Sequence, residues 1–119
     1  MLYEVFHSVA FPLMKQGLRR SGRADYQAWA SWFATADPWA TYQSAQSLAR
    51  WSDSGKLLPM FEALPNKAYV YGLQSERVPH ILPKLRGIET YEIPNSQHFP
   101  MIDNPASFYQ TLARIIMET

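Results

Sequence analysis

Residues 1–64 repeat their apolar side chains at the spacing of α-helices. The segment Tyr3–Arg20 carries this pattern throughout. Pro12 lies within the segment and predicts a kink or break, because proline cannot donate a backbone hydrogen bond. A second helix is predicted in RADYQAWASWFATADP, where the apolar residues recur on one helical face. These residues are Tyr26, Trp29, Ala30 and Phe33.

The dipeptide Asp37-Pro38 predicts the start of another helix. An aspartate suits the N-cap, and proline suits the first helical position because its missing N–H would have no partner there. The run WATYQSAQSLARW follows with one apolar side. A serine-rich turn and a short helix in WSDSGKLLPMFEAL then complete the region, which ends at Pro65-Asn66.

After residue 66 the pattern changes from helical to strand-like. KAYVYG (67–72) is short, β-branched and aromatic, and it ends at a glycine, which is typical of a strand. IETYEIP (88–94) alternates two sets of side chains and predicts a second strand, stopped by Pro94. Between the two strands, Pro83 limits VPHILPKLRG to a short or broken helix.

Asn104-Pro105 repeats the cap-and-proline signal and predicts a closing helix. Its apolar face is made of Phe108, Leu112, Ile115 and Ile116. A strand–helix–strand order with a crossover of this length implies parallel strands. Parallel strands are almost always buried in sheets of several strands, and a two-stranded sheet is marginal even when antiparallel. We therefore expect 67–118 to be the edge of a larger sheet whose other strands are encoded elsewhere.

Composition excludes several classes of protein. The chain of 119 residues is long enough for one domain, and its net charge of +1 argues against an electrostatic nucleic-acid binder. The absence of cysteine excludes disulfides, zinc thiolates and cysteine nucleophiles, and no histidine or carboxylate pair has metal-ligand spacing. We expect no metal and no cofactor. No apolar run reaches the ~18 residues that a membrane span needs. Glu4 and His7 interrupt the apolar residues at the start of the chain, which makes them a poor signal peptide. We therefore expect a cytoplasmic location without membrane binding.

One stretch of the chain is basic. It contains Lys15, Arg19, Arg20 and Arg23, with Gly17 and Gly22 between them. The stretch could form a patch for an anionic partner, or it could be a solvated helix end that stops at a glycine. We favour the helix end.

The segment KAYVYG…ETYEIPNSQHFPMIDNPASFYQTLARII resembles the C-terminal end of an α/β-hydrolase. In that family the last two strands of an eight-stranded sheet precede a loop with the catalytic histidine and a final helix. The run SQHFPMIDNPASFYQTL is similar to the family pattern small-x-His-Phe-x-x-x-(Asp/Glu)-Asn-Pro. The aromatic helices look like the helical cap that many members insert before the seventh strand. The resemblance thus implies the α/β class and a partial α/β-hydrolase fold, with a cap-like region at 1–64, a β-α-β-α part of the core at 65–119, and the N-terminal half missing.

The resemblance also implies a triad in the chain order nucleophile, acid, histidine, with the nucleophile on G-x-S-x-G between a strand and a helix. The nearest candidate in this sequence is Ser52 in RWSDS, but Arg50 stands where a small residue is needed and no strand precedes it. The oxyanion-hole glycines are missing as well. We therefore expect a truncated serine hydrolase for ester or amide substrates, inactive as this chain, with its nucleophile upstream of Met1.

The acid of the triad has two candidate positions. Many members carry an aspartate three residues past the glycine that ends the seventh strand, and here that position, counted from Gly72, is Ser75. Glu76 comes next, and a carboxylate there could fix the tautomer of the histidine and stabilise its positive charge. In other members the acid follows the sixth strand, which this chain would lack.

His98 lies in the polar loop IPNSQHFP, and the resemblance places it at the position of the catalytic base. There it would take a proton from a serine hydroxyl and return it to the leaving group. Without the family context, His98 would be a loop histidine bonded to local backbone. The alternative function is a non-enzymatic module that self-associates, because tryptophans without a domain beneath them would leave an exposed apolar surface.

Overall fold

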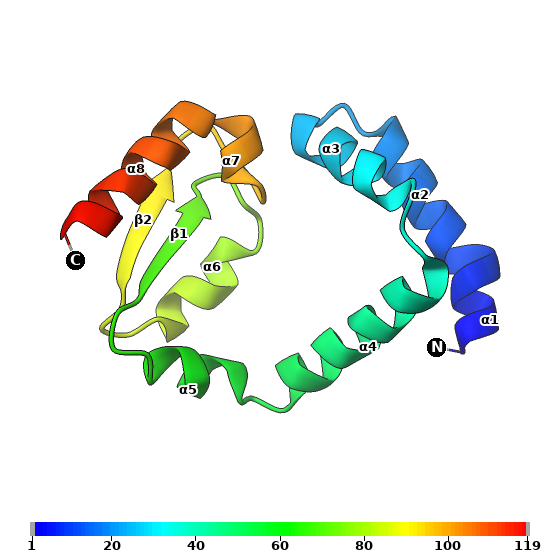
Figure 1. The fold of residues 1–119 in the computed structure, drawn as a ribbon, viewed down its shortest axis with the longest axis horizontal. Helices are drawn as coiled ribbons and strands as arrows, with labels where there is room; N and C mark the ends of the chain where they lie inside the picture. The colour runs from blue at the N-terminus through cyan, green and yellow to red at the C-terminus, as the bar shows by residue number, and fades with distance from the viewer. Residues whose placement is uncertain (1, 119) are drawn as a thin grey trace. The chain divides into compact units, whose positions relative to one another are not determined.

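A computed structural model describes residues 2–118 (Figure 1). The chain divides into two compact units, one that ends at Pro59 and one that begins at Met60. We call them the helical unit and the sheet unit and describe each by itself. The helix α5 (Leu57–Glu62) crosses the division.

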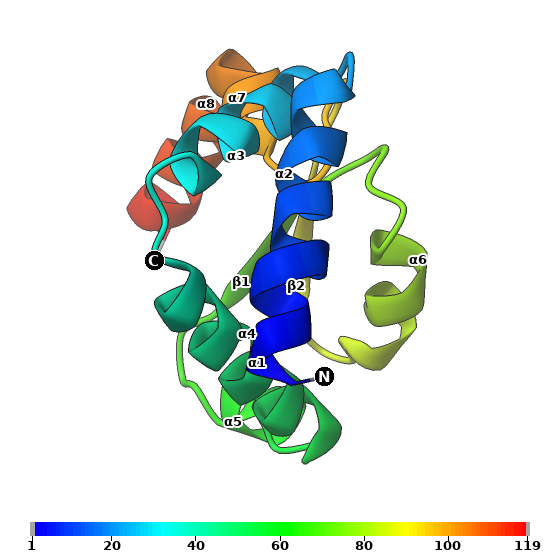
Figure 2. The ribbon, with the colours of Figure 1, turned by 90° about the vertical axis from the view of Figure 1, so that its right-hand side faces the viewer.

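The helical unit begins with one continuous helix, whose full length is visible in Figure 2. It consists of α1 (Tyr3–Val5), the π-helical turn η1 (Phe6–Ala10) and α2 (Phe11–Arg20). The break expected at Pro12 takes the form of this π turn, in which the Phe11 N–H donates to the Phe6 carbonyl five residues earlier. A π turn re-routes the backbone hydrogen bonds just before the proline, so the helix continues through it.

Two further helices complete the helical unit, α3 (Ala24–Phe33) and α4 (Pro38–Asp53). The Asp37 carboxylate accepts the Ala40 N–H at 2.8 Å, which confirms the predicted N-cap. Aromatic rings of the unit contact one another at edge and tilted angles, such as the buried Phe11 against Phe33 with ring centroids 6.0 Å apart. The rings involved are Tyr3, Phe6, Phe11, Trp29, Phe33, Trp39 and Tyr42.

The sheet unit holds two parallel strands, β1 (Ala68–Gly72) and β2 (Glu89–Ile93), in a register that runs from Ala68↔Glu89 to Gly72↔Ile93. Both strands and their parallel pairing confirm the sequence prediction. The crossover is the short helix α6 (Val78–Ile81) followed by the 3-10 turn η2 (Leu82–Lys84), as Pro83 predicted.

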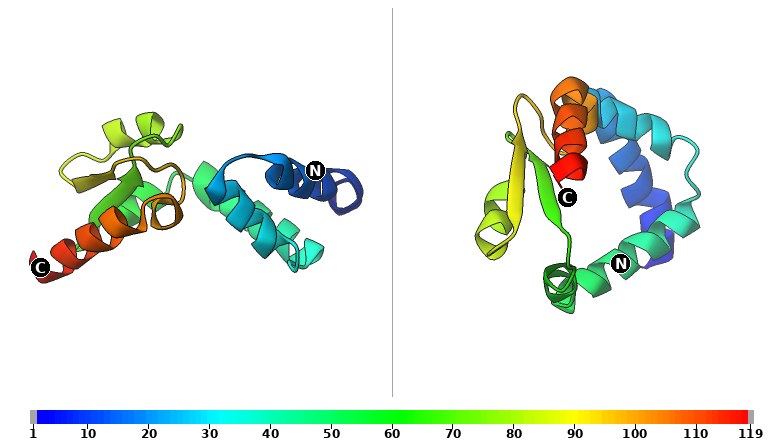
Figure 3. Two further views of the ribbon diagram at one scale, coloured as in Figure 1. Left: turned by 90° about the horizontal axis from the view of Figure 1, so that it is seen from above. Right: turned by 60° about the vertical axis from the view of Figure 1, so that its left-hand side comes forward.

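The final part of the sheet unit consists of α7 (Pro100–Asp103) and α8 (Pro105–Glu118). The sequence analysis predicted α8 but no helix at the position of α7. The right-hand panel of Figure 3 shows α6 and α8 on opposite sides of the two strands. Ile93, at the end of β2, is fully buried, and Val78, Leu85 and Ile88 from the crossover are buried as well.

The predicted fold class is wrong. We expected the α/β class, as part of an α/β-hydrolase fold, but the structure is 64% helical, and its two strands form a small sheet in which no α/β-hydrolase fold is evident. The physical reason is that two strands of five residues cannot reproduce the layered sheet of that fold, and helical periodicity dominates the rest of residues 2–118. The cap-and-core division at residue 64 stays a prediction; the compact units meet at residues 59 and 60.

Candidate functional site

Both predicted site residues follow the carboxyl ends of the parallel strands. Glu76 lies in the turn between β1 and α6, and His98 lies in the loop between β2 and α7. Gly72 and Ile93, the last residues of the two strands, are paired with each other. Because parallel strands end at the same edge of a sheet, Glu76 and His98 both follow that edge, where open sheets hold their ligands.

The loop after β2 begins with a tight, internally bonded turn. Asn95 has a φ of 52°, in the left-handed region that asparagine tolerates better than most residues. The buried Ser96 hydroxyl donates to the Ile93 carbonyl at 2.7 Å. The side chain of Ser96 thus satisfies a buried strand-end carbonyl and sets the direction of the chain toward His98.

The same loop is tied to the end of β1 by backbone contacts. The Leu73 N–H donates to the Ile93 carbonyl at 3.0 Å, and the Gln74 N–H donates to the Ser96 carbonyl at 2.9 Å. At Gly72 an added Cβ would lie 2.0 Å from the Gln97 carbonyl oxygen. Only glycine lets the two backbones approach this closely, so Gly72 is required for the loop to sit at the strand end.

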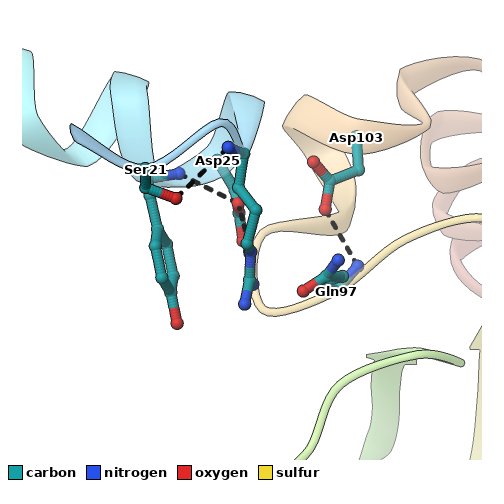
Figure 4. Close-up of polar contacts among 6 residues, drawn as sticks. Ser21, Asp25, Gln97 and Asp103 are labelled. Carbon is teal, nitrogen blue, oxygen red and sulfur yellow. Dashed lines mark hydrogen bonds and ion pairs between the residues drawn. The ribbon is translucent and has the colours of Figure 1, made fainter. Parts of the chain in front are cut away.

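Two side chains close the loop from its other end, one at the end of α7 and one between α7 and α8. The Asp103 carboxylate accepts the Gln97 N–H at 2.8 Å (Figure 4). The Asn104 side-chain amide donates to the Pro94 carbonyl at 2.7 Å, while its oxygen accepts the Ser107 N–H at 3.3 Å and so caps α8. The cap was predicted from the sequence, whereas the two bonds back to the loop were not.

The His98 side chain is exposed, and its ring meets the Phe99 ring edge to face with centroids 4.6 Å apart. An exposed imidazole on a loop with this many backbone anchors is accessible to a reacting group and restricted in position. An imidazole can accept a proton at one ring nitrogen and donate one from the other.

Glu76 is exposed too, and within residues 2–118 no hydrogen bond or ion pair joins its carboxylate to His98. Both residues therefore follow one edge of the sheet, and no hydrogen bond or ion pair joins them within the described residues. The role of Glu76 as the orienting acid stays a prediction. Ser52, the rejected nucleophile candidate, lies within α4 rather than between a strand and a helix.

The basic stretch does not present all of its charges to solvent. The Arg23 guanidinium forms an ion pair of 2.7 Å with Asp25 and lies 3.8 Å from the centre of the Tyr26 ring (Figure 4). The Lys15 ammonium lies 4.8 Å from the Phe11 ring centre. These contacts agree with a helix end rather than a patch for an anionic partner. Helix α2 ends at Arg20, two residues before Gly22.

The sequence analysis missed Asp25, the most buried carboxylate of the helical unit. Burial raises the pKa of Asp25, but hydrogen bonds and positive charge from Arg23 and the Tyr26 N–H outweigh it, so the pKa lies below its ordinary value. The Arg-x-Asp spacing was the only available signal. It is too common to identify a buried pair by itself.

A separate hollow lies at the amino ends of the strands, away from the edge that His98 follows. Its lining comprises Asn66, Lys67, Ala68, Glu89, Tyr91, Ile115, Ile116 and Glu118. The Tyr91 hydroxyl donates to Glu89 at 2.8 Å, a bond that raises the pKa of Tyr91. In the described part of the chain, no group of three or more metal-ligating side chains could hold a metal, and no helix could span a membrane.

We compared the chain with known proteins in three ways. No family model matches it, and neither the curated proteins nor the solved structures contain a match.

Proposed function

We propose that the sheet unit supplies the general base of a serine hydrolase, and that His98 is this base. The supporting observation is the exposed imidazole on a loop anchored where two parallel strands end. The sequence resemblance of residues 67–118 to the end of an α/β-hydrolase supports the same role. Although the chain by itself does not form that fold, the base needs only a fixed loop and a partner hydroxyl.

In this mechanism His98 accepts a proton and passes it on twice in each cycle. It removes the proton of a serine hydroxyl as the serine oxygen bonds to the acyl carbon, and it gives that proton to the departing alcohol or amine. Water then loses a proton to His98 as it attacks the acyl-enzyme, and the proton returns to the serine oxygen as the carboxylic acid leaves. The substrate is therefore a small ester, amide or related acyl compound.

The serine would come from a segment other than residues 1–119, because this sequence contains no G-x-S-x-G and its nearest candidate lies on a helix. The donors of the oxyanion hole would come from the same segment. The orienting carboxylate is either Glu76 or a residue of that segment. On this proposal the chain alone is inactive.

The test combines a fluorophosphonate probe, which labels activated serines, with hydrolysis of a p-nitrophenyl ester. Chain 1–119 alone should show neither labelling nor turnover. The chain should gain both when it is co-expressed with a polypeptide from the reading frame directly before the Met1 codon. In that complex His98→Ala should lower kcat at least about 1,000-fold. If the chain alone is labelled above its His98→Ala variant, the serine lies within residues 1–119 and the expected inactivity of the chain is wrong. If the complex is indifferent to His98, the assignment of His98 as the base is wrong.

The acid can be assigned in the same complex. If Glu76 orients His98, Glu76→Gln should lower kcat by about 100-fold or more, since loss of the third triad member disables the base. If the acid lies elsewhere, Glu76→Gln should change kcat less than about threefold. Arg77→Gln, next to Glu76 in the same turn, serves as the matched control.

A second candidate function is a non-enzymatic module that self-associates. It is favoured by apolar side chains that are exposed in the helical unit, among them Leu13 at 61% and Leu48 at 66%. Light scattering after size exclusion distinguishes the two candidates. A compact, monodisperse dimer that dissociates in Leu13→Asp would support the module, and a monomer would contradict it.

The proposed compartment is the cytoplasm, because the chain uses no cysteine, which suits a reducing compartment. The balanced net charge of +1 argues against binding to nucleic acid or an anionic membrane surface. A fluorescent fusion that is recovered in a secreted or membrane fraction would contradict this assignment.

A further inference from the structure

Asp103 holds both chain neighbours of His98. Its carboxylate accepts the N–H of Gln97 at 2.8 Å, and its own N–H donates to the carbonyl of Phe99 at 3.1 Å. Together the two bonds link Asp103 to the residues before and after His98, so the segment 97–103 forms a closed loop that contains His98. Figure 4 shows the bond to Gln97. We propose that Asp103 is a positioning residue for His98, an inference that rests on the proposed function.

The segment 97–103 is also held against the end of β1, so its position relative to the sheet is fixed. On the side of β1, the Gln74 N–H holds the Ser96 carbonyl at 2.9 Å, and the Gln97 carbonyl oxygen lies 2.0 Å from where a Cβ on Gly72 would be. The Gln97 backbone is thus too close to Gly72 to move further toward β1. The backbone just before His98 is therefore fixed against β1 and held in addition by a carboxylate–amide bond, which is stronger than a neutral one.

The carboxylate of Asp103 is bonded to the loop and does not cap a helix. Asp103 is the last residue of the four-residue helix α7, two residues before α8 begins. The N-cap of α8 is supplied by Asn104, whose oxygen accepts the Ser107 N–H. The hydrogen bond of the Asp103 carboxylate goes instead to the Gln97 N–H, one residue before His98.

Positioning by Asp103 can be measured on chain 1–119 without any substrate. Amide hydrogen exchange resolved by NMR reports the Gln97 N–H directly. The His98 ring protons report its packing on Phe99 through the ring-current shift, and they are assigned with His98→Gln. The variants Asp103→Ala and Asp103→Asn differ in the acceptor for the Gln97 N–H, because asparagine keeps a side-chain oxygen that can accept this bond and alanine does not.

Asp103→Ala should speed exchange of the Gln97 amide about tenfold or more and move the His98 ring signals toward those of an unpacked histidine. Asp103→Asn should stay within about threefold of the unmodified chain and keep the ring signals. Amides of the strand pair, such as Val70 and Tyr91, should be unaffected in both variants. Glu76→Ala, which removes an exposed carboxylate from the same unit, should leave Gln97 unchanged.

Three results would overturn the proposal. The Gln97 amide of the unmodified chain could exchange as fast as the exposed Glu76 amide, which would mean that the bond is not formed. Asp103→Ala could speed exchange at Gln97 without moving the His98 ring signals, which would make Asp103 an anchor with no effect on the base. Equal acceleration of Gln97 and the strand amides in both variants would assign Asp103 to folding instead.

The two proposals fail in distinguishable ways. If the proposed hydrolase is wrong, the co-expressed complex shows no labelling while the exchange pattern at Gln97 still follows the Asp103 variants. If both hold, Asp103→Ala should lower kcat of the complex by about 10- to 100-fold and change KM less than about threefold, because a small displacement of the base affects the chemical step. Asp103→Asn should recover most of that kcat.

Discussion

The helical unit and the sheet unit are organised by different kinds of contact. In the helical unit, aromatic rings pack at a range of angles, and the buried carboxylate of Asp25 is neutralised by Arg23 two residues away along the chain. In the sheet unit, the decisive contacts are between backbone segments far apart in sequence, such as Gly72 with Gln97. Ring packing tolerates small shifts, whereas a backbone approach with no space for a methyl group does not.

This difference teaches where a fixed chemical group can be placed. His98 lies beside backbone that is held by Gly72, Ser96 and Asp103. The helical unit instead leaves several large apolar side chains exposed, including Leu13 and Leu48. Four predictions test the comparison, beginning with the largest expected effect.

Gly72→Ala should destabilise the sheet unit by about 3 kcal/mol or more, because the new methyl would collide with the Gln97 backbone, which cannot rotate away. Gly17→Ala is the matched control, since nothing lies within 4 Å of that position and it sits inside α2. That control should gain about 0.5–1 kcal/mol from the better helix propensity of alanine. Hydrogen exchange of each unit measures both. A Gly72→Ala chain with unchanged protection of the β1 amides would show that the loop does not press on the strand.

Asp25→Ala should destabilise the helical unit by about 2 kcal/mol, since it removes the charged hydrogen bonds to Arg23 and Tyr26. The pKa of Asp25 is lower in the folded state than in the unfolded one, so its contribution is fully present above the unfolded pKa and is lost as pH falls through the folded pKa. Urea unfolding between pH 7 and pH 3 should show a decline below about pH 4 that Asp25→Asn lacks. Asp53→Asn, at an exposed position, should retain the decline.

Removing a helix cap should affect the sheet unit more than the helical unit. Asp37→Ala loses one cap bond, to Ala40, and should destabilise α4 by about 1 kcal/mol. Asn104→Ala loses the cap of α8 and also the bond to the Pro94 carbonyl, so we expect about 2 kcal/mol. Thermal unfolding followed by circular dichroism ranks the two variants. The reverse order would mean that the bond to Pro94 contributes nothing.

The smallest effect is expected for the exposed ion pair on α8. The Arg114 and Glu118 side chains are 4.0 Å apart and about 60% exposed, so Glu118→Gln should change stability by less than about 0.5 kcal/mol. A larger change, measured by the same unfolding assay, would show that the end of α8 contributes more than its geometry suggests.

Local signals predicted the elements well where a single residue type dictates the backbone. Asp37-Pro38 and Asn104-Pro105 begin α4 and α8 as expected, and the alternating run 88–94 contains β2. Pro12 was correctly expected to disturb its helix, although the form of the disturbance, a π turn, depends on hydrogen-bond partners that periodicity does not reveal. The short helix α7 was missed because its four residues are fewer than a periodic pattern needs.

The fold class failed for a different reason. The resemblance of the C-terminal residues to an α/β-hydrolase led us to expect part of that family's large sheet. The structure instead has two strands within a largely helical chain. For the candidate site, the loop histidine could be selected from the sequence, but its anchors could not. The hydrogen bond from Gln97 to Asp103 and the approach of Gly72 become visible only when the loop is folded.

By itself, the sequence determined where α4, α8 and the two strands begin, that the two strands run parallel, and which histidine follows the second strand. These are consequences of backbone chemistry and of chain connectivity over a few residues. Tertiary structure alone decided that Asp25 would be buried beside Arg23 and that Asp103 would hold both neighbours of His98. Such pairings depend on the distance between groups in space, and a carboxylate has the same chemistry in the sequence whether it later faces water or an amide.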